Sequence, residues 1–341
     1  MASNSAGGRR RPPTSADVAR HAGVSRATVS YVLNAIPDSG ISEPTIARVH
    51  ASARELGYIP HVLARSLRSG TSKLVLIPEF QVPPGPSVDA FFGEMRASLT
   101  RRGYTVVTHG HRATRGLAAA RAWAELRPVG IIVGTKRLTR AGVELLRSTG
   151  TVAILGLGWA PSDLVPTLVQ DHAGVGACAV EYLVSRGHRR IAVVVPSDPA
   201  LRSLGLERLA GCARVAARHS ITVEPVDLGY DEAEADALAV LWRKGEPPSA
   251  VFAYNDEYAM LLMRAMADGG LAVPADMAVV GADDLPLCQL LRPRLTSVRV
   301  EVRGSARVVA ETLHTMIQHS DRLPVTGARL FTSSIVPRES A

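Results

Sequence analysis

The sequence has few cysteines, few aromatic residues and no long apolar run. Aromatic residues make up only 4% of its 341 residues, and it has three cysteines. Cys178, Cys212 and Cys288 are odd in number and far apart, which fits a reducing compartment and no metal-ligand spacing. No apolar run reaches the roughly 18 residues of a membrane-spanning helix. We therefore expect no disulfide framework, metal site, cofactor or membrane contact.

The net charge of +8 is distributed unevenly along the chain. Residues 1–72 contain nine arginines and four acidic residues, a balance of +5, and the other 269 residues contribute only +3. A basic end on a nearly neutral body indicates a partner with a phosphate backbone, although a solubilising arginine tail would have the same charge. Arg9 to Arg11 are followed by Pro12 and Pro13 rather than by an apolar segment, so we expect no secretion signal. We predict a disordered basic tail over 1–13 and a cytoplasmic, nucleoid-associated protein.

Residues 15–33 have the spacing of a helix-turn-helix. Ser15 is a plausible N-cap for a first helix whose inward face includes Ala19. Gly23 supplies the left-handed turn of a close helix corner, which Val29 then fills. The other inward positions are Val18 in the first helix, Val24, Val32 and Leu33 around the second, and Ile46, Val49, Ala53 and Leu56 in a third helix over 43–56 with Ser42 as its cap. This pattern alone also fits a three-helix unit without any ligand.

The run Thr-Ser-Ala-Asp-Val-Ala-Arg-His-Ala-Gly-Val-Ser-Arg-Ala-Thr-Val-Ser-Tyr-Val-Leu-Asn, residues 14–34, resembles the headpiece of LacI/GalR-type transcriptional repressors. Glu55-Leu-Gly-Tyr-Ile-Pro60 and Ala64-Arg-Ser-Leu-Arg68 extend the resemblance. It implies a helix-turn-helix DNA-binding domain over 14–59, followed by a hinge helix and linker over 60–72. It also implies a homodimer that places one recognition helix per subunit in the major groove of palindromic double-stranded operator DNA.

The resemblance assigns DNA contacts position by position. Arg26, Ala27 and Tyr31 fall on base-reading positions of the second helix: Arg26 can reach guanine O6 and N7, and Ala27 a thymine methyl group. Tyr31 stands where the family often has arginine, so the base it reads is open. The backbone-contact positions are Thr14, Thr28, Ser30 and Asn34. Leu67 is expected to wedge into the minor groove from the hinge helix, with a flexible linker carrying incidental leucines as the alternative.

Apolar strands and helices alternate after residue 72. Strands are predicted at 73–78, 104–108, 129–133 and 152–155, with helices at 91–102, 114–126 and 139–148, and the alternation continues to residue 281. Such alternation requires parallel sheets with crossover helices, and we predict two α/β lobes over 73–170 and 170–298. The resemblance implies a two-lobed periplasmic-binding-protein-like body, 73–341, for effector binding and dimerisation. In it, 301–322 return to the first lobe and 325–341 to the second, and the ligand lies between the lobes.

The resemblance also identifies six candidate effector-binding residues: Phe91, Asp171, Arg208, Tyr230, Asn255 and Asp283. Arg208 is expected to hold effector hydroxyls or a carboxylate, and Asp283 to accept two hydroxyl hydrogen bonds. Each residue has a structural alternative. Asn255 can cap a helix, Asp283 can cap a turn, and Arg208 can be a surface ion-pair partner.

Two other functions share parts of this pattern. Gly174-Val-Gly-Ala-Cys-Ala179 matches a dinucleotide-binding fingerprint, with Asp198 about 20 residues further on. The fingerprint glycines must form the turn directly after a strand, whereas 173–184 is predicted to be a continuous helix. A solute-binding transport protein would share the body without the headpiece. We therefore predict a DNA-binding repressor, not an enzyme, controlled by a small polar, sugar-like metabolite.

Overall fold

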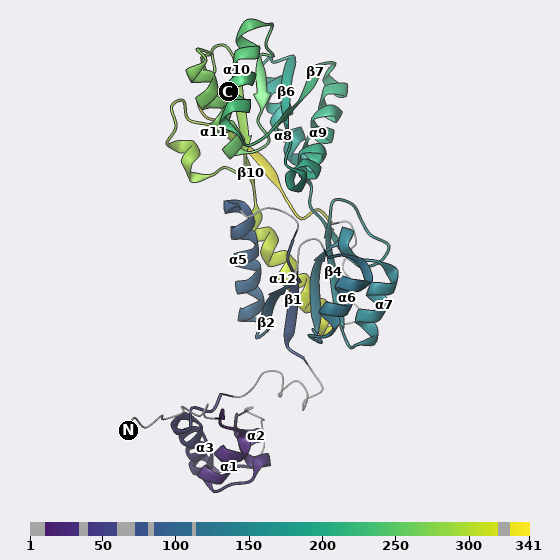
Figure 1. The fold of residues 1–341 in the computed structure, drawn as a ribbon, viewed down its shortest axis with the longest axis vertical. Helices are drawn as coiled ribbons and strands as arrows, with labels where there is room; N and C mark the ends of the chain where they lie inside the picture. Colours follow the sequence, from purple (N-terminus) through teal and green to yellow (C-terminus); the bar gives the residue numbers. More distant parts are fainter. Residues whose placement is uncertain (1–10, 34–39, 60–71, 81–84, 111–113, 320–327) are drawn as a thin grey trace, which may run out of the picture. The chain divides into compact units, whose positions relative to one another are not determined.

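The computed structural model describes residues 11–33, 40–59, 72–80, 85–110, 114–319 and 328–341. The chain divides into two compact units, Met1–Ser72 and Lys73–Ala341 (Figure 1). Each unit has hydrophobic clusters of its own. Asn34, Leu67, and residues 1–10 of the expected tail lie outside the described residues, so what we expect of them remains a prediction.

The first unit contains three helices: α1 (Ser15–Ala22), α2 (Arg26–Leu33) and α3 (Glu43–Glu55). Our expectation that Ser15 is the N-cap of α1 is wrong, because Thr14 has the extended backbone of a cap and Ser15 is already helical. The Thr14 side chain accepts from the Asp17 amide at 3.4 Å, and the Thr14 amide donates to the Asp17 carboxylate at 2.8 Å. This reciprocal capping box satisfies two amides that the helix itself leaves unpaired.

A small core joins the three helices as the sequence predicts. Val18 and Val29 are completely buried at the corner of α1 and α2, and Val49 of α3 closes the cluster. Gly23 ends α1 in the left-handed region with φ +64°, where a side chain would be strained. Arg48 donates from Nε to the carbonyl of Ala22 at 2.9 Å, which ties α3 to the same turn.

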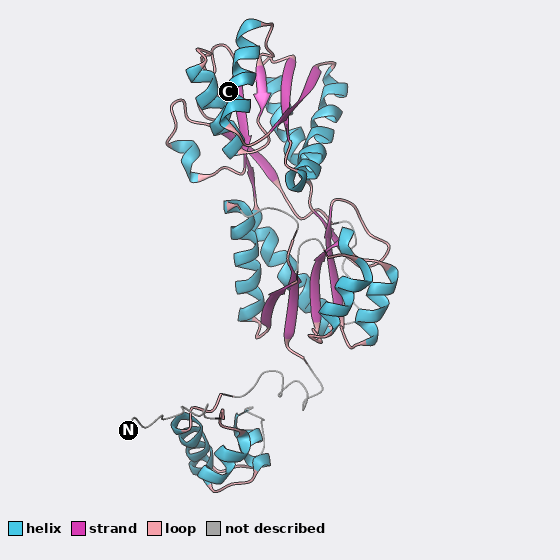
Figure 2. Cartoon of the chain, viewed as in Figure 1, coloured by secondary structure: helices cyan, strands magenta, loops and turns pink. Residues whose placement is uncertain are grey.

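The first lobe of the second unit is a three-layer α/β/α sandwich (Figure 2). Its five strands are all parallel and lie in the order β2-β1-β3-β4-β5. The strands are β1 (Leu74–Pro78), β2 (Thr105–His109), β3 (Gly130–Gly134), β4 (Ala153–Gly158) and β5 (Thr167–Val169). Helices α5 (Pro86–Arg101) and α12 (Val302–Gln318) cover one face, and α6 (Gly116–Ala124) and α7 (Arg140–Ser148) cover the other. A short 3₁₀ turn, η1 (Thr135–Arg137), follows β3.

The second lobe repeats this plan with one added strand. Its order is β11-β10-β9-β8-β6-β7, parallel except for the antiparallel pair of β10 and β11. The strands are β6 (Arg190–Pro196), β7 (Thr222–Leu228), β8 (Ala250–Phe252), β9 (Ala278–Ala282), β10 (Thr296–Val300) and β11 (Ser333–Val336). Helices α8 (His172–Ser185) and α9 (Pro199–His219) pack against one face, and α10 (Glu232–Lys244) and α11 (Asp256–Asp268) against the other. A 3₁₀ turn, η2 (Pro286–Gln289), lies between β9 and β10.

The predicted fold is confirmed, with one correction at the last crossing between the lobes. The chain leaves the first lobe after β5, returns after β10 to form α12, and crosses again before β11. The expected return to the second lobe at residue 325 starts too early. Residues 328–330 still lie beside β5, where the Val169 amide donates to Ala328 at 2.8 Å and the Leu330 amide donates to Val169 at 2.7 Å. Hydrogen bonding to an edge strand therefore keeps this segment in the first lobe.

Candidate functional site

Helix α2 buries one side and exposes the other. Val29 and Val32 are buried in the core of the first unit, whereas Arg26, Ala27 and Tyr31 are exposed. Tyr31 is 46% exposed, although large aromatic side chains usually seek burial. The three residues that we assign to base reading therefore share the accessible side of a helix whose opposite side is anchored.

The hydroxyl groups assigned to the DNA backbone already have local partners. Ser25 caps α2 by accepting from the Thr28 amide at 3.0 Å, and the Ser25 and Thr28 hydroxyls are 2.9 Å apart. Thr14 donates its hydroxyl to Asp17 at 2.7 Å, and Ser30 is half-buried. These contacts fix the start of each helix, and the contacts of Thr14, Thr28 and Ser30 with phosphate remain predictions.

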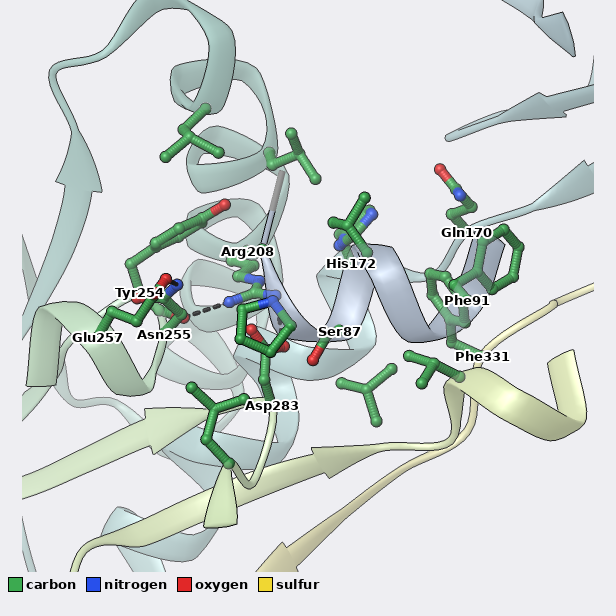
Figure 3. A pocket seen from close by; sticks show the side chains of 18 of the residues that line it. Ser87, Phe91, Gln170, His172, Arg208, Tyr254, Asn255, Glu257, Asp283 and Phe331 are labelled. Atoms are coloured by element: carbon green, nitrogen blue, oxygen red, sulfur yellow. Dashed lines mark hydrogen bonds and ion pairs between the residues drawn. The ribbon is translucent and has the colours of Figure 1, made fainter. Parts of the chain in front are cut away.

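The second unit contains a cavity lined by residues of both lobes (Figure 3). Its volume is about 170 Å³, below the roughly 300–1,000 Å³ of sites for drug-sized molecules, so it suits a small ligand. The chain has only five phenylalanines, and four of them line this cavity: Phe80, Phe91, Phe92 and Phe331. Phe91 is in ring contact with both Phe92 and Phe331, at centroid distances of 5.3 and 6.1 Å.

Arg208 projects from α9 into the cavity and is only 5% exposed. One terminal nitrogen donates to the carbonyl of Tyr254, and the other lies 3.5 Å from a carboxylate oxygen of Asp283. The guanidinium also lies over the Tyr254 ring, 4.6 Å from its centroid. The surface ion-pair alternative is therefore wrong, because Arg208 is buried. Its Nε has no partner among the described residues, and such a buried donor is available to a ligand.

Asn255 and Asp283 come from the carboxyl ends of neighbouring strands. Asn255 follows β8 and caps α11 by accepting from the Tyr258 amide at 3.0 Å, so the capping alternative is correct. It lines the cavity as well, with its amide nitrogen 3.2 Å from Glu257. Asp283 follows β9 with φ +102°, a conformation that side chains rarely adopt. Strain of this kind is found where the surroundings fix a functional side chain.

His172 was missed by the sequence reasoning. It begins α8 and lines the cavity, with its ring 5.7 Å from that of Phe331. Burial, and then the nearby charge of Arg208, lower the pKa of His172 to about 3, so the imidazole is neutral at physiological pH. Its Nδ1 is buried without a partner among the described residues. A neutral imidazole can donate or accept one hydrogen bond there, and no motif in the sequence indicated it.

Two of the six predicted effector residues do not line the cavity. Asp171 instead caps α8, accepting from the Gly174 amide at 2.8 Å and pairing with Arg329 at 3.0 Å. Tyr230 is 64% exposed and contacts the Tyr258 ring at a centroid distance of 5.3 Å. The structure brings together Phe91, Arg208, Asn255 and Asp283.

The glycines of the dinucleotide fingerprint lie inside a helix, and Gly176 allows that helix to pack closely against α9. Gly174 and Gly176 lie within α8 rather than in a turn directly after a strand. A Cβ on Gly176 would overlap the carbonyl of Arg208, and one on Gly211 of α9 would overlap the carbonyl of Ala173. The two helices therefore approach too closely for side chains at these positions. No group of residues that could hold a metal ion occurs in the described part of the chain.

An exposed helix-turn-helix and a two-lobed ligand-binding body define a DNA-binding protein with a small-molecule site, and comparisons with known proteins identify the family. Residues 14–61 match the family of bacterial regulatory proteins of the lacI type, and residues 180–341 match a periplasmic binding protein-like domain. The chain is 30% identical over 316 residues to the transcriptional repressor PurR of Vibrio atlanticus (strain LGP32), covering 89% of this chain and 92% of that protein. It is 32% identical over 304 residues to the ribose operon repressor of Escherichia coli (strain K12), covering 84% and 87%.

The structural comparison extends over nearly the whole chain. The Lac repressor dimer bound to operator and the anti-inducer ONPF superposes with a TM-score of 0.78 at 26% identity, covering 97% of this chain and 99% of that one. The chain belongs to the LacI family. It is a DNA-binding transcriptional regulator under the control of a small-molecule effector. None of the helices in the described part of the chain is both long and apolar enough to span a membrane.

Proposed function

We propose that this protein is a repressor that reads its operator with Arg26, Ala27 and Tyr31. A small sugar-like molecule in the cleft either weakens or strengthens its binding to the operator. The observation that carries the proposal is that four predicted residues from four separate segments line one cavity. There the buried Nε of Arg208 has no partner among the described residues. A buried donor of this kind suits a ligand hydroxyl. The names of the relatives, among them a ribose operon repressor, support the same ligand class.

The cleft is coupled to DNA through the angle between the lobes. A ligand that contacts Phe91 of the first lobe and Arg208 of the second stabilises one lobe angle. A change of angle alters the spacing of the two headpieces in a dimer, so that they no longer match both half-sites. By linkage, ligand and operator change each other's affinity by the same factor, typically about 5–150-fold.

We infer that the protein acts by binding rather than by catalysis, in the cytoplasm at the nucleoid. The position of Gly174 and Gly176 inside α8, rather than in the turn directly after a strand, supports this inference, because it removes the sequence basis for a dinucleotide-dependent enzyme. The relatives described above are repressors as well.

The test is a selection of genomic fragments on the purified protein at modest salt, with and without a panel of sugars, nucleosides and purines. We expect a palindromic site to be enriched, and its affinity to change with at least one compound. A protein that prefers no fragment over bulk competitor under either condition contradicts the proposal. If an operator is found but no compound changes its affinity, the proposal that a ligand in the cleft controls DNA binding is wrong.

A further inference from the structure

The cleft carries an excess of negative charge among the described residues that line it. Its only permanent cation is Arg208, and its two acidic residues are Glu257 and Asp283. His172 does not balance them, because burial and Arg208 lower its pKa to about 3 and the imidazole is neutral near pH 7. These side chains together carry one net negative charge.

The two acidic residues differ in how far they are compensated. Asp283 lies 3.5 Å from Arg208, whose guanidinium is also occupied by the Tyr254 carbonyl and the face of the Tyr254 ring. The carboxylate of Glu257 receives only the neutral amide of Asn255, at 3.2 Å. Figure 3 shows Glu257 beside Asn255, on the side of the pocket away from Phe91 and Phe331. Glu257 is therefore an acidic group at the ligand site that pairs with no cation among the described residues.

The aromatic side of the cleft also disfavours an anionic ligand. Phe80, Phe91, Phe92 and Phe331 line the cavity with apolar rings that offer no hydrogen bond to an anion. A phosphate or carboxylate would lose its water against these rings and meet a site that is already negative. Ser87 and Gln170 add a neutral hydroxyl and a neutral amide to the lining. The only cation among the described lining residues is Arg208, whose two terminal nitrogens already face the Tyr254 carbonyl and Asp283, so it offers no bidentate clamp for a phosphate.

We propose that the cleft takes a small ligand without phosphate or carboxylate, that it binds an amine-bearing ligand more tightly than the neutral parent, and that Glu257 sets this preference. The ligand places its apolar face on the four phenylalanines and its hydroxyl or ammonium donors on Asp283 and Glu257. This assignment rests on the proposed role of the cleft as the effector site. It excludes sugar phosphates as effectors and includes neutral sugars, amino sugars and aromatic amines.

Calorimetry on the full-length protein with charge-matched probes tests the proposal. One set of probes is glucose, glucosamine and glucose 6-phosphate, a second is the corresponding galactose compounds, and a third is phenylethanol, phenylethylamine and phenylacetate. In each set that binds, we expect the amine to bind about tenfold or more tightly than the neutral parent, as an additional charge-assisted hydrogen bond would give, and the anion to bind more weakly than the neutral parent. An amine that binds no more tightly than its neutral parent overturns the proposal. An anion that binds as tightly as its neutral parent overturns the proposal, as does the absence of binding by every member at millimolar concentration.

Glu257→Gln isolates the charge, because it keeps the size of the side chain and one acceptor oxygen while removing the negative charge. We expect the ratio of amine to neutral affinity to fall about tenfold. Glu144→Gln on the exposed side of α7 is the matched control, and it should leave the ratio unchanged. If Glu257→Gln keeps the wild-type ratio while its thermal unfolding matches that of the wild type, Glu257 does not set the preference.

The measurement contains no DNA, so it separates this proposal from the proposed function. A phosphorylated compound that binds the cleft and alters operator affinity overturns the ligand class and leaves the regulator intact. If the protein prefers no operator, the proposed regulatory function is wrong. Calorimetry then still tests the charge preference of the cavity.

Discussion

The carboxylate of Asp256 accepts a hydrogen bond from the hydroxyl of Ser297 at 2.6 Å, and both side chains are completely buried. The second carboxylate oxygen accepts from the Leu285 amide at 2.7 Å, and Ser297 Oγ accepts from the Asp284 amide at 3.0 Å. This pair therefore holds the turn that follows β9. The same turn carries Asp283 into the cleft at its strained φ of +102°. Asp256 acts on the ligand site through the backbone and does not line the cavity.

Asp256→Ala tests this positioning role. The substitution leaves the Leu285 amide and the Ser297 hydroxyl buried without their acceptor, so we expect a loss of about 1–3 kcal/mol in the free energy of unfolding. Urea denaturation measures this loss, and hydrogen exchange should show faster exchange at the amide of Leu285. Asp256→Asn retains an acceptor of the same shape and should lose less. An alanine variant with wild-type stability and wild-type exchange at Leu285 would contradict the role.

The neutral state of His172 predicts a stability that falls in acid. The pKa of His172 is lowered to about 3 in the folded chain, mainly by burial, and a histidine in the unfolded chain titrates near 6.5. As the pH falls from about 6.5 towards 3, the unfolded state gains a proton that the folded state excludes, and stability is lost by at most about 1.4 kcal/mol per pH unit.

The measurement is the pH dependence of unfolding in wild type and in His172→Gln, which cannot titrate. The variant should lose stability less steeply below pH 6.5, whereas His109→Gln, at an exposed position of β2, should behave as the wild type does. Burial raises the pKa of Asp256 to about 7, which gives the opposite slope: its contribution is lost as the pH rises from about 4 through 7. Comparing variant with wild type cancels that slope. Identical slopes below pH 6.5 would show that His172 does not cause the acid loss.

Glycine-to-alanine substitutions in two helices should have opposite effects on stability, because one glycine is in a close helix contact and the other has open space beside it. Gly176→Ala places a methyl group against the carbonyl of Arg208 and the sulfur of Cys212, so we expect a loss of about 1–3 kcal/mol through overpacking. Gly93 lies within α5, and a Cβ there meets nothing within 4 Å. Gly93→Ala should therefore stabilise the protein by about 0.5–1 kcal/mol. Chemical denaturation of both variants checks this, and a Gly176→Ala protein as stable as the wild type would contradict the close approach.

Arg26→Ala tests base reading by α2. If Arg26 contacts a guanine edge, we expect the variant to lose about 1–3 kcal/mol of operator affinity and to discriminate less at one base position. Fluorescence anisotropy with the selected operator and its single-base variants measures both effects. Arg147→Ala, on the exposed side of α7, removes the same charge far along the chain and serves as the control. An equal loss on all sequences would assign Arg26 to phosphate instead.

Much of the architecture was predictable because it depends on local rules. The spacing of Ala19, Gly23 and Val29 predicted the helical corner of the headpiece, and the alternation of apolar strands with helices predicted the two lobes. The family resemblance placed Arg208, Asn255 and Asp283 at one site. The cap of α1 was missed by one residue, because serine and threonine are both good caps and only the backbone of Thr14 distinguishes them.

The sequence by itself determined the elements, their order and the charge of the headpiece, since periodicity, caps and composition act over short stretches of chain. Only the tertiary structure decided what meets in the cleft. Crossover connections bring the ends of β1, β5, β8 and β9 together, and the position of a side chain in the sequence does not indicate that it will share a cavity with another. Packing alone buried His172 and placed Glu257 where no described residue offers it a cation. It also turned Asp171 and Tyr230 away from the cavity that their positions in the sequence had suggested for them.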